Sequence, residues 1–127
     1  MFGLKRSKKI LVVDDEKETL VLLTKILERA NYEVISTSTG QEAVGLAKKQ
    51  QPSLIILDVV LPDIDGGEVA SILSKDSSTA NIPIVFLTGV IRKDEEAEGL
   101  KTGKRYVIAK PVVVEDLLRI MDQALSG

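Results

Sequence analysis

Three aspartates of this chain stand directly after apolar runs, where a buried strand would open into a loop. Asp58 follows the run 54–57, and Asp14 and Asp15 follow the run 10–13. A carboxylate in such a position is held rigidly and still reaches solvent, as a nucleophile or a metal ligand must. Because the carboxyl ends of parallel strands meet at one edge of a sheet, we expect the three carboxylates to lie close together.

A hydroxyl and an ammonium group end two further apolar runs, since Thr88 follows 84–87 and Lys110 follows 107–109. Crowded carboxylates need a cation, because two like charges about 4 Å apart repel by roughly 4 kcal/mol at an effective dielectric of about 20. Oxygen ligands alone favour a hard ion, Mg²⁺ before Ca²⁺ or Mn²⁺. The set indicates phosphoryl transfer, in which Asp58 attacks phosphorus while Mg²⁺, Lys110 and the Thr88 hydroxyl stabilise the phosphoryl oxygens.

Each of these residues also has a purely structural interpretation. Asp14 and Asp15 could cap the first helix, and Asp58 could be an ordinary loop acid. Thr88 and Lys110 begin common turn dipeptides with Gly89 and Pro111. Their shared place at strand ends favours a functional site, because independent coincidences would all have to fall on one edge of one sheet.

The composition limits the chemistry. The 127 residues fit one domain, and a net charge of −2 gives no sign of a nucleic-acid or membrane binder. No apolar run is long enough to span a membrane and no signal peptide is visible, so we expect a cytoplasmic protein. The chain has no cysteine and no histidine, which excludes disulfides, thiolate or imidazole metal ligands and histidine-based catalysis.

Short apolar runs alternate with amphipathic stretches, which predicts an α/β fold with a parallel sheet covered on both faces. The predicted strands contain residues 10–13, 34–35, 54–57, 84–87 and 107–109. We expect a single domain over 1–127, with a core from about 9 to 125 and a basic leader over 1–8.

Five helices are expected between and after these strands. The first runs from about 16 to 30; Thr39 and Glu42 form a capping box that opens the second, which Pro52 ends. The fourth, over 94–102, has few apolar residues to anchor it. The apolar positions of the other helices are Leu20, Leu23, Ile26, Leu27 and Ala30 in the first, Val44 and Ala47 in the second, Val69, Ile72 and Leu73 in the third, and Leu117, Ile120, Met121, Ala124 and Leu125 in the fifth.

Four motifs taken together resemble the response-regulator receiver domains of two-component signalling. They are LVVDDE at 11–16, IILDVVLPDIDGG at 55–67, VFLTG at 85–89 and AKP at 109–111. The resemblance covers almost the whole chain. It implies a doubly wound, flavodoxin-like (βα)5 fold with strand order 2-1-3-4-5.

The same resemblance assigns roles to single residues. Asp58 corresponds to the phosphoacceptor, Thr88 to the switch hydroxyl and Lys110 to the phosphate-pairing lysine, whose bond to Pro111 is often cis in this family. The implied magnesium ligands are Asp58, Asp15 and the Val60 carbonyl directly, and Asp14 through water.

The resemblance further implies a signalling protein that promotes its own phosphorylation and slow dephosphorylation, in place of a turnover enzyme. The expected phosphodonor is a sensor histidine kinase or a phosphotransfer protein. A downstream effector, or a second copy of the chain, would contact the face formed by the fourth helix, fifth strand and fifth helix. No direct contact with nucleic acid or membrane is expected.

Some positions depart from the family pattern. The family's switch aromatic lies three residues before the lysine, where this chain has Val107, and the aromatic residue is Tyr106 instead. A regular strand would direct Tyr106 and Val107 to opposite faces, whereas a bulge would re-aim Tyr106. Val60 and Val90 stand where polar residues are common, and we expect slow hydrolysis of the phosphoryl group because valines offer the attacking water no hydrogen bond.

Three alternatives stay open at this point. A haloacid-dehalogenase-like phosphohydrolase uses a similar sheet but requires Asp-x-Asp after the first strand, where this chain has Asp14-Asp15-Glu16. A flavodoxin-like FMN module is disfavoured because an acidic loop repels phosphate. A receiver-fold module that is never phosphorylated would keep only the fold.

Overall fold

Five parallel strands form one sheet in the computed structural model, which describes residues 8–89 and 105–126. The strands are β1 (Lys9–Val13), β2 (Glu33–Thr37), β3 (Leu54–Asp58), β4 (Ile84–Thr88) and β5 (Arg105–Ala109). They lie in the order β2-β1-β3-β4-β5, and each neighbouring pair is parallel. The predicted fold class and strand order are therefore confirmed, and every predicted apolar run lies within an observed strand.

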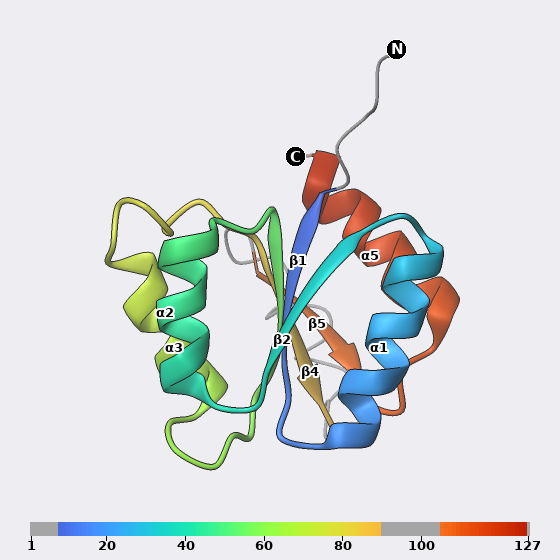
Figure 1. The fold of residues 1–127 in the computed structure, drawn as a ribbon, viewed down its shortest axis with the longest axis horizontal. Coiled ribbons are helices and arrows are strands. Elements are labelled where there is room, and N and C mark those ends of the chain that lie inside the picture. The colour runs from blue at the N-terminus through green and yellow to red at the C-terminus, as the bar shows by residue number, and fades with distance from the viewer. Residues whose placement is uncertain (1–7, 90–104, 127) are drawn as a thin grey trace.

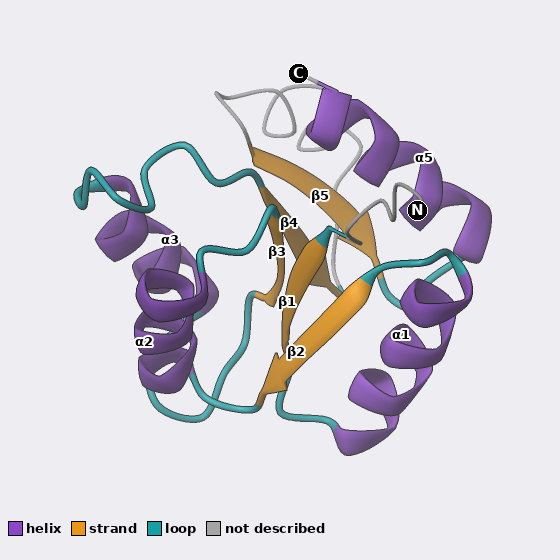
Figure 2. Cartoon of the chain, turned by 45° about the horizontal axis from the view of Figure 1, so that its top comes forward, coloured by secondary structure: helices purple, strands orange, loops and turns teal. Residues whose placement is uncertain are grey.

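Helices cover both faces of the sheet (Figures 1 and 2). The helices α1 (Lys17–Arg29) and α5 (Val114–Ser126) lie on one face, and α2 (Gly40–Gln50) and α3 (Gly66–Ser74) lie on the other. The expected helix over 94–102 falls outside the described residues. In the part of the chain that the structure describes, no helix is long and apolar enough to cross a membrane.

Alternating side chains of the central strands divide the core into two layers. In β1, Ile10 and Val12 pack toward α1 and α5, whereas Leu11 and Val13 pack toward α2 and α3. β3 contributes to both layers in the same way and is buried along its whole length. A strand with helices on both faces needs apolar residues at every position, which explains the continuous apolar runs in the sequence.

The predicted helix faces are correct in α1 and wrong at one position of α3. Leu23 and Leu27 of α1 are fully buried, and so are Val69 and Leu73 of α3. The sequence pattern places Ile72 beside them, but it is 36% exposed. The reason is helical geometry, because Ile72 lies about 100° from Leu73 around the helix axis and the sheet covers only one side of α3.

The N-terminus of α2 is capped as predicted, but by only half of a capping box. Thr39 Oγ1 accepts a hydrogen bond from the Glu42 N–H at 3.3 Å. The Glu42 carboxylate accepts a hydrogen bond from the Thr37 hydroxyl on β2, and so ties the helix start to the neighbouring strand. The helix ends at Gln50, and its C-cap Gln51 adopts a left-handed conformation with φ 48° directly before Pro52.

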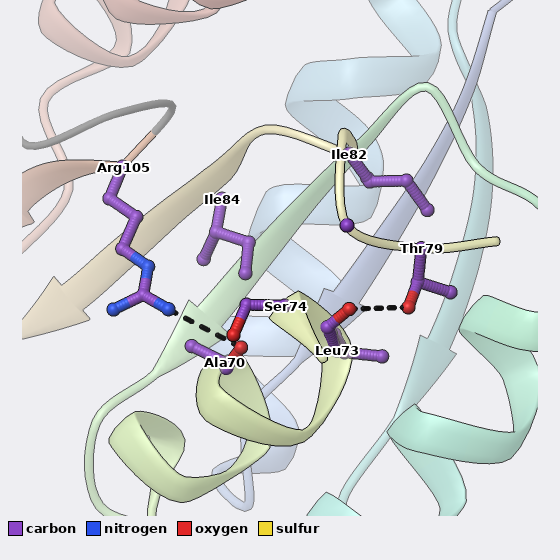
Figure 3. A pocket seen from close by; sticks show the side chains of 8 residues that line it. Ala70, Leu73, Ser74, Thr79, Ile82, Ile84 and Arg105 are labelled. Atoms are coloured by element: carbon purple, nitrogen blue, oxygen red, sulfur yellow. Dashed lines mark hydrogen bonds between the residues drawn. The ribbon is translucent and has the colours of Figure 1, made fainter. Parts of the chain in front are cut away.

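A small cavity lies near the amino ends of β4 and β5, where Ile84 and Arg105 begin these strands (Figure 3). Arg105 Nη2 donates to the Ala70 carbonyl at 3.4 Å, and Thr79 Oγ1 donates to the Leu73 carbonyl at 2.7 Å. Both polar groups are thus directed to carbonyl groups of α3. We interpret this cavity as part of the structural packing, at the end of the strands away from the predicted site.

Gly66 allows α3 to begin directly against the end of β3. A Cβ atom at Gly66 would lie 2.4 Å from the Asp58 carbonyl oxygen and 2.9 Å from Val59 Cα, so the backbone would have to move. We expect Gly66→Ala to lower the free energy of unfolding by about 3 kcal/mol, at the upper end of overpacking effects. Urea unfolding monitored by circular dichroism measures the loss.

Gly45 in α2 provides the matched control, because a Cβ there would meet nothing within 4 Å. Alanine is the better helix former, so Gly45→Ala should raise the free energy of unfolding by about 0.5–1 kcal/mol. Opposite signs are expected for the two substitutions. Similar small effects would contradict the close approach at Gly66.

Candidate functional site

The predicted acidic edge is formed where β1 and β3 end side by side. Val13 pairs with Leu57 in the parallel register, so the next residues, Asp14 and Asp58, lie at the same edge of the sheet. Both are buried, with Asp14 at 0% and Asp58 at 5% exposure. Asp14 Oδ1 accepts the Glu16 N–H at 2.8 Å, which fixes its carboxylate in the turn after β1. Asp14 therefore belongs to the edge of the sheet where the site lies. It is not the N-cap of α1, because Glu16 occupies the N-cap position.

Lys110 brings the ammonium group into this acidic edge. Its backbone N–H donates to the Thr88 carbonyl at 2.8 Å, which continues the pairing with β4 one residue beyond the end of β5. Its Nζ lies 2.8 Å from Asp14 Oδ2, 2.9 Å from Glu16 Oε1 and 3.1 Å from Asp58 Oδ2. Three carboxylates from two chain segments thus surround one ammonium group. The Lys110–Pro111 peptide bond is cis, as the resemblance implied.

Burial and the neighbouring opposite charges shift the pKa values of Asp14 and Lys110 in opposite directions. Desolvation by burial raises the pKa of Asp14, and this effect outweighs its contact with Lys110 and the hydrogen bond from Glu16. Burial disfavours the charged form of Lys110, yet the surrounding carboxylates outweigh it and hold the pKa of Lys110 well above its ordinary value. Lys110 is therefore a permanent cation at any physiological pH.

The three carboxylates carry more negative charge than the single ammonium group of Lys110 can neutralise. One oxygen each of Asp14, Glu16 and Asp58 lies within 4.8 Å of the others, which suits a shared cation. Asp14 Oδ2 contacts Lys110 as an ion pair, but the contact does not have hydrogen-bond geometry; among the described residues it is the buried side-chain oxygen left without a hydrogen bond. An all-oxygen, acidic set with an unsatisfied buried oxygen fits Mg²⁺.

Glu16 is the member of this cluster that the sequence analysis did not assign. The helical pattern marks it only as the start of the first helix, although its spacing of two from Asp14 was a usable signal. Asp15 was predicted as a direct metal ligand; it is exposed and does not belong to the cluster of Asp14, Glu16 and Asp58. The ligand role of Asp15 stays a prediction.

Two backbone hydrogen bonds after Asp58 keep Val60 next to the site. Val60 N–H donates to Asp58 Oδ1 at 3.2 Å, and Val59 N–H donates to the Leu87 carbonyl at 3.0 Å. The Val60 side chain is 71% exposed. The backbone that would carry the predicted carbonyl ligand therefore begins next to Asp58, and the valine side chain faces solvent.

Tyr106 and Val107, the residues at and beside the switch position, lie in a regular strand. β5 pairs with β4 residue by residue, from Ile84 opposite Arg105 to Thr88 opposite Ala109, so the alternative of a bulge at Tyr106 is wrong. Tyr106 packs in the core layer of α1 and α5, the layer that also contains Ile108. Tyr106 and Val107 therefore point to opposite faces of the sheet, and the exclusion of Tyr106 from the switch position stays a prediction. The predicted role of Val90 falls outside the described residues.

Comparison with known proteins agrees with this geometry. A sequence model of the response regulator receiver domain matches residues 10–122. Over 119 residues the chain is 31% identical to Protein PilH of Pseudomonas aeruginosa, and the match covers 94% of this chain and 98% of PilH. It is 44% identical to the alkaline phosphatase synthesis transcriptional regulatory protein PhoP of Bacillus subtilis, covering 83% of this chain but only 43% of PhoP.

A solved structure with the same fold carries a metal. The receiver domain of sensor histidine kinase PA1611 from Pseudomonas aeruginosa superposes with a TM-score of 0.85 at 25% identity, covering 95% of this chain and 99% of that domain. It contains a magnesium ion coordinated in its active-site cleft.

Proposed function

The chain belongs to the response regulator receiver domain family, and on this basis we propose that Asp58 accepts a phosphoryl group in a two-component signalling system. The observation that carries the proposal is the convergence of Lys110 on Asp58 at 3.1 Å within an acidic cluster in which both aspartates are buried. The phosphodonor would be a sensor histidine kinase or a phosphotransfer protein. This membership favours the receiver over the phosphohydrolase and FMN alternatives.

In the proposed reaction an Asp58 carboxylate oxygen attacks phosphorus in line. A new O–P bond forms while the bond between phosphorus and the donor's imidazole nitrogen breaks, and its electron pair stays on that nitrogen. Lys110 is close enough to exchange its contact with Asp58 for one with a phosphoryl oxygen, and the Thr88 hydroxyl would donate to another. A bound Mg²⁺ would neutralise charge that develops on the phosphoryl oxygens.

The donor would approach the site through a cleft beside Lys110. This cleft is lined by Glu16, Thr19, Leu22, Pro111 and Val112 together with Lys110. It lies where β5 leads into α5 and where α1 begins. We propose that an effector or a second copy contacts the face formed by the fourth helix expected over 94–102, β5 and α5, so that donor and output would use different surfaces.

The proposal is tested by incubating the protein with acetyl phosphate and MgCl2 and measuring its intact mass. We expect one added phosphoryl group that is stable in acid and lost in alkali, with acetate leaving in place of imidazole. An unlabelled protein would favour the remaining alternative, a receiver-fold interaction module that is never phosphorylated.

Magnesium binding gives an independent prediction. Mg²⁺ should raise the free energy of unfolding by about 1.4 kcal/mol at about ten times its Kd, because it binds the folded acidic edge and not the unfolded chain. Thermal melts in EDTA and in MgCl2 measure this shift. The proposed ligands are Asp58, Asp15 and the Val60 carbonyl directly, and Asp14 through water.

Two neighbouring substitutions test which acid after Asp14 binds the metal. If Asp15 is the ligand, Asp15→Asn should remove most of the magnesium-induced shift, and Glu16→Gln should retain it. The reverse result would transfer the ligand role to Glu16, the acid that lies within the cluster. If the melting temperature of the parent protein is the same in EDTA and in MgCl2, the metal proposal is contradicted.

A further inference from the structure

The ends of the loop that carries Val60 are hydrogen-bonded to each other and to the start of α3. Gly66 N–H donates to the Val59 carbonyl at 2.7 Å, which closes the loop over 59–66. Asp65 Oδ1 accepts the Glu68 N–H at 2.8 Å and so caps α3. These bonds hold the loop ends, but neither fixes the middle of the loop against another element.

Asp63 supplies the hydrogen bonds between that middle and α2, beside the packing of Leu61 and Ile64 against the core layer of α2 and α3. Its Oδ1 accepts the Gly40 N–H at 2.8 Å and its Oδ2 accepts the Gln41 N–H at 2.9 Å. Gly40 and Gln41 are the first residues of α2, whose N–H groups have no partner within the helix. Both carboxylate oxygens are thus engaged by one helix end, where the helix dipole also favours a negative charge. These backbone hydrogen bonds lower the pKa of Asp63.

Close packing beside the Asp63 carboxylate also holds the loop against the start of α2. A Cβ atom at Gly40 would lie 2.6 Å from Ile64 Cγ1 and 3.1 Å from the Ile64 carbonyl oxygen, so glycine allows α2 to approach the loop closely. Val69 of α3 lies beside Gly40 as well, and its Cγ2 would lie 2.8 Å from the same Cβ atom. The loop after β3, α2 and α3 therefore meet at one point.

The start of α2 has a cap of its own in addition to Asp63. Thr39 already serves as the N-cap by accepting the Glu42 N–H. Asp63 adds two bonds that cross between segments 22 and 23 residues apart in the chain. Such bonds restrict where the loop lies relative to α2, which is a positional effect beyond helix capping.

We propose that Asp63 is a positioning residue, whose carboxylate fixes the loop to α2 and thereby holds the Val60 carbonyl at the distance from Asp58 that Mg²⁺ binding requires. The inference rests on the proposed function, because it concerns the same metal site. Asp63 is three residues beyond Val60, so loss of its two bonds would let the Val60 backbone move without removing any ligand.

The test compares Asp63→Ala with Thr39→Ala, which removes a cap from the same helix and leaves the loop bonds intact. Titration calorimetry with MgCl2 gives the Kd, and urea unfolding in EDTA gives the stability of each variant separately. We expect Asp63→Ala to raise the Kd about tenfold, as loss of an outer-shell support typically does, and Thr39→Ala to leave it unchanged. Asp63→Asn should be intermediate, because its amide oxygen can accept one of the two bonds.

The outcomes separate this inference from the proposed function. If the parent binds Mg²⁺ and is labelled at Asp58 while Asp63→Ala has the parent's Kd, only the role of Asp63 is overturned. Equal rises of Kd in Asp63→Ala and Thr39→Ala would also overturn it, because helix stability would then be the cause. If Asp63→Ala does not fold, the Kd of Asp63→Asn is compared with the Kd of the parent and of Thr39→Ala in its place. A parent that binds no Mg²⁺ overturns both.

Discussion

Replacing Asp58 by asparagine should abolish the added mass that acetyl phosphate and MgCl2 produce in the parent protein. Asparagine has nearly the same shape, and its amide oxygen can still accept the Val60 N–H that Asp58 Oδ1 accepts at 3.2 Å. The amide lacks the anionic oxygen that attacks phosphorus, so the reaction is lost although the fold is kept. Intact-mass spectra taken over the time course measure this effect.

Asp65→Asn is the matched control for this loss. Asp65 lies in the same loop and caps α3 through Oδ1, which asparagine can do equally well. This variant should be labelled like the parent. Labelling of Asp58→Asn at the parent's level would place the nucleophile elsewhere, and peptide mapping would then identify it.

Removal of the Lys110 ammonium should have the second largest effect. With Lys110→Ala, we expect the rate of phosphorylation by acetyl phosphate to fall about 10²- to 10³-fold, the usual cost of losing one group that stabilises transition-state charge. Asp58 remains available, so prolonged incubation should still produce labelled protein. The rate is measured from intact-mass time courses at fixed acetyl phosphate and saturating MgCl2.

The same variant should be less stable in EDTA at neutral pH. Asp14 is fully buried and would lose its counterion, which costs about 3 kcal/mol for a buried pair. Burial already raises the pKa of Asp14 above its ordinary 3.8, and loss of Lys110 raises it further. The folded variant then binds a proton at a pH where the unfolded chain does not, so the deficit should shrink as the pH falls from neutrality toward 3.8.

Lys48→Ala provides the control for a lysine in an ordinary surface ion pair. Lys48 Nζ lies 3.5 Å from Asp76 Oδ2, with both side chains substantially exposed, so its removal should change stability by less than about 1 kcal/mol. It should leave the phosphorylation rate unchanged. A Lys110→Ala rate close to that of Lys48→Ala would remove Lys110 from the proposed mechanism.

The sequence alone determined the elements and the edge at which the candidate site lies. Strand and helix periods are local patterns, and a strand buried on both faces needs an apolar residue at each position, as in 54–57. The first polar residue after such a run marks the strand end, which is why the apolar runs suffice to assign Asp14, Asp58 and Lys110 to one edge. The strand order came from the resemblance of whole motifs.

Only the tertiary structure decided which side chains meet at that edge. Glu16 approaches Lys110 across 94 residues of sequence, and Asp63 reaches the start of α2 across 22 and 23. No local period encodes such contacts, because they depend on how the loops after β1 and β3 fold against other elements.

The exposure of Ile72 and the place of Tyr106 were decided in the same way. Ile72 fits an apolar helical pattern, but only the position of α3 on the sheet determines which arc of the helix is covered. Tyr106 is compatible with either a bulge or a regular strand, and the unbroken pairing with β4 directs it into the core layer beside α5. Sequence periodicity sets the possible faces of an element, whereas its packing partners select the face that is buried.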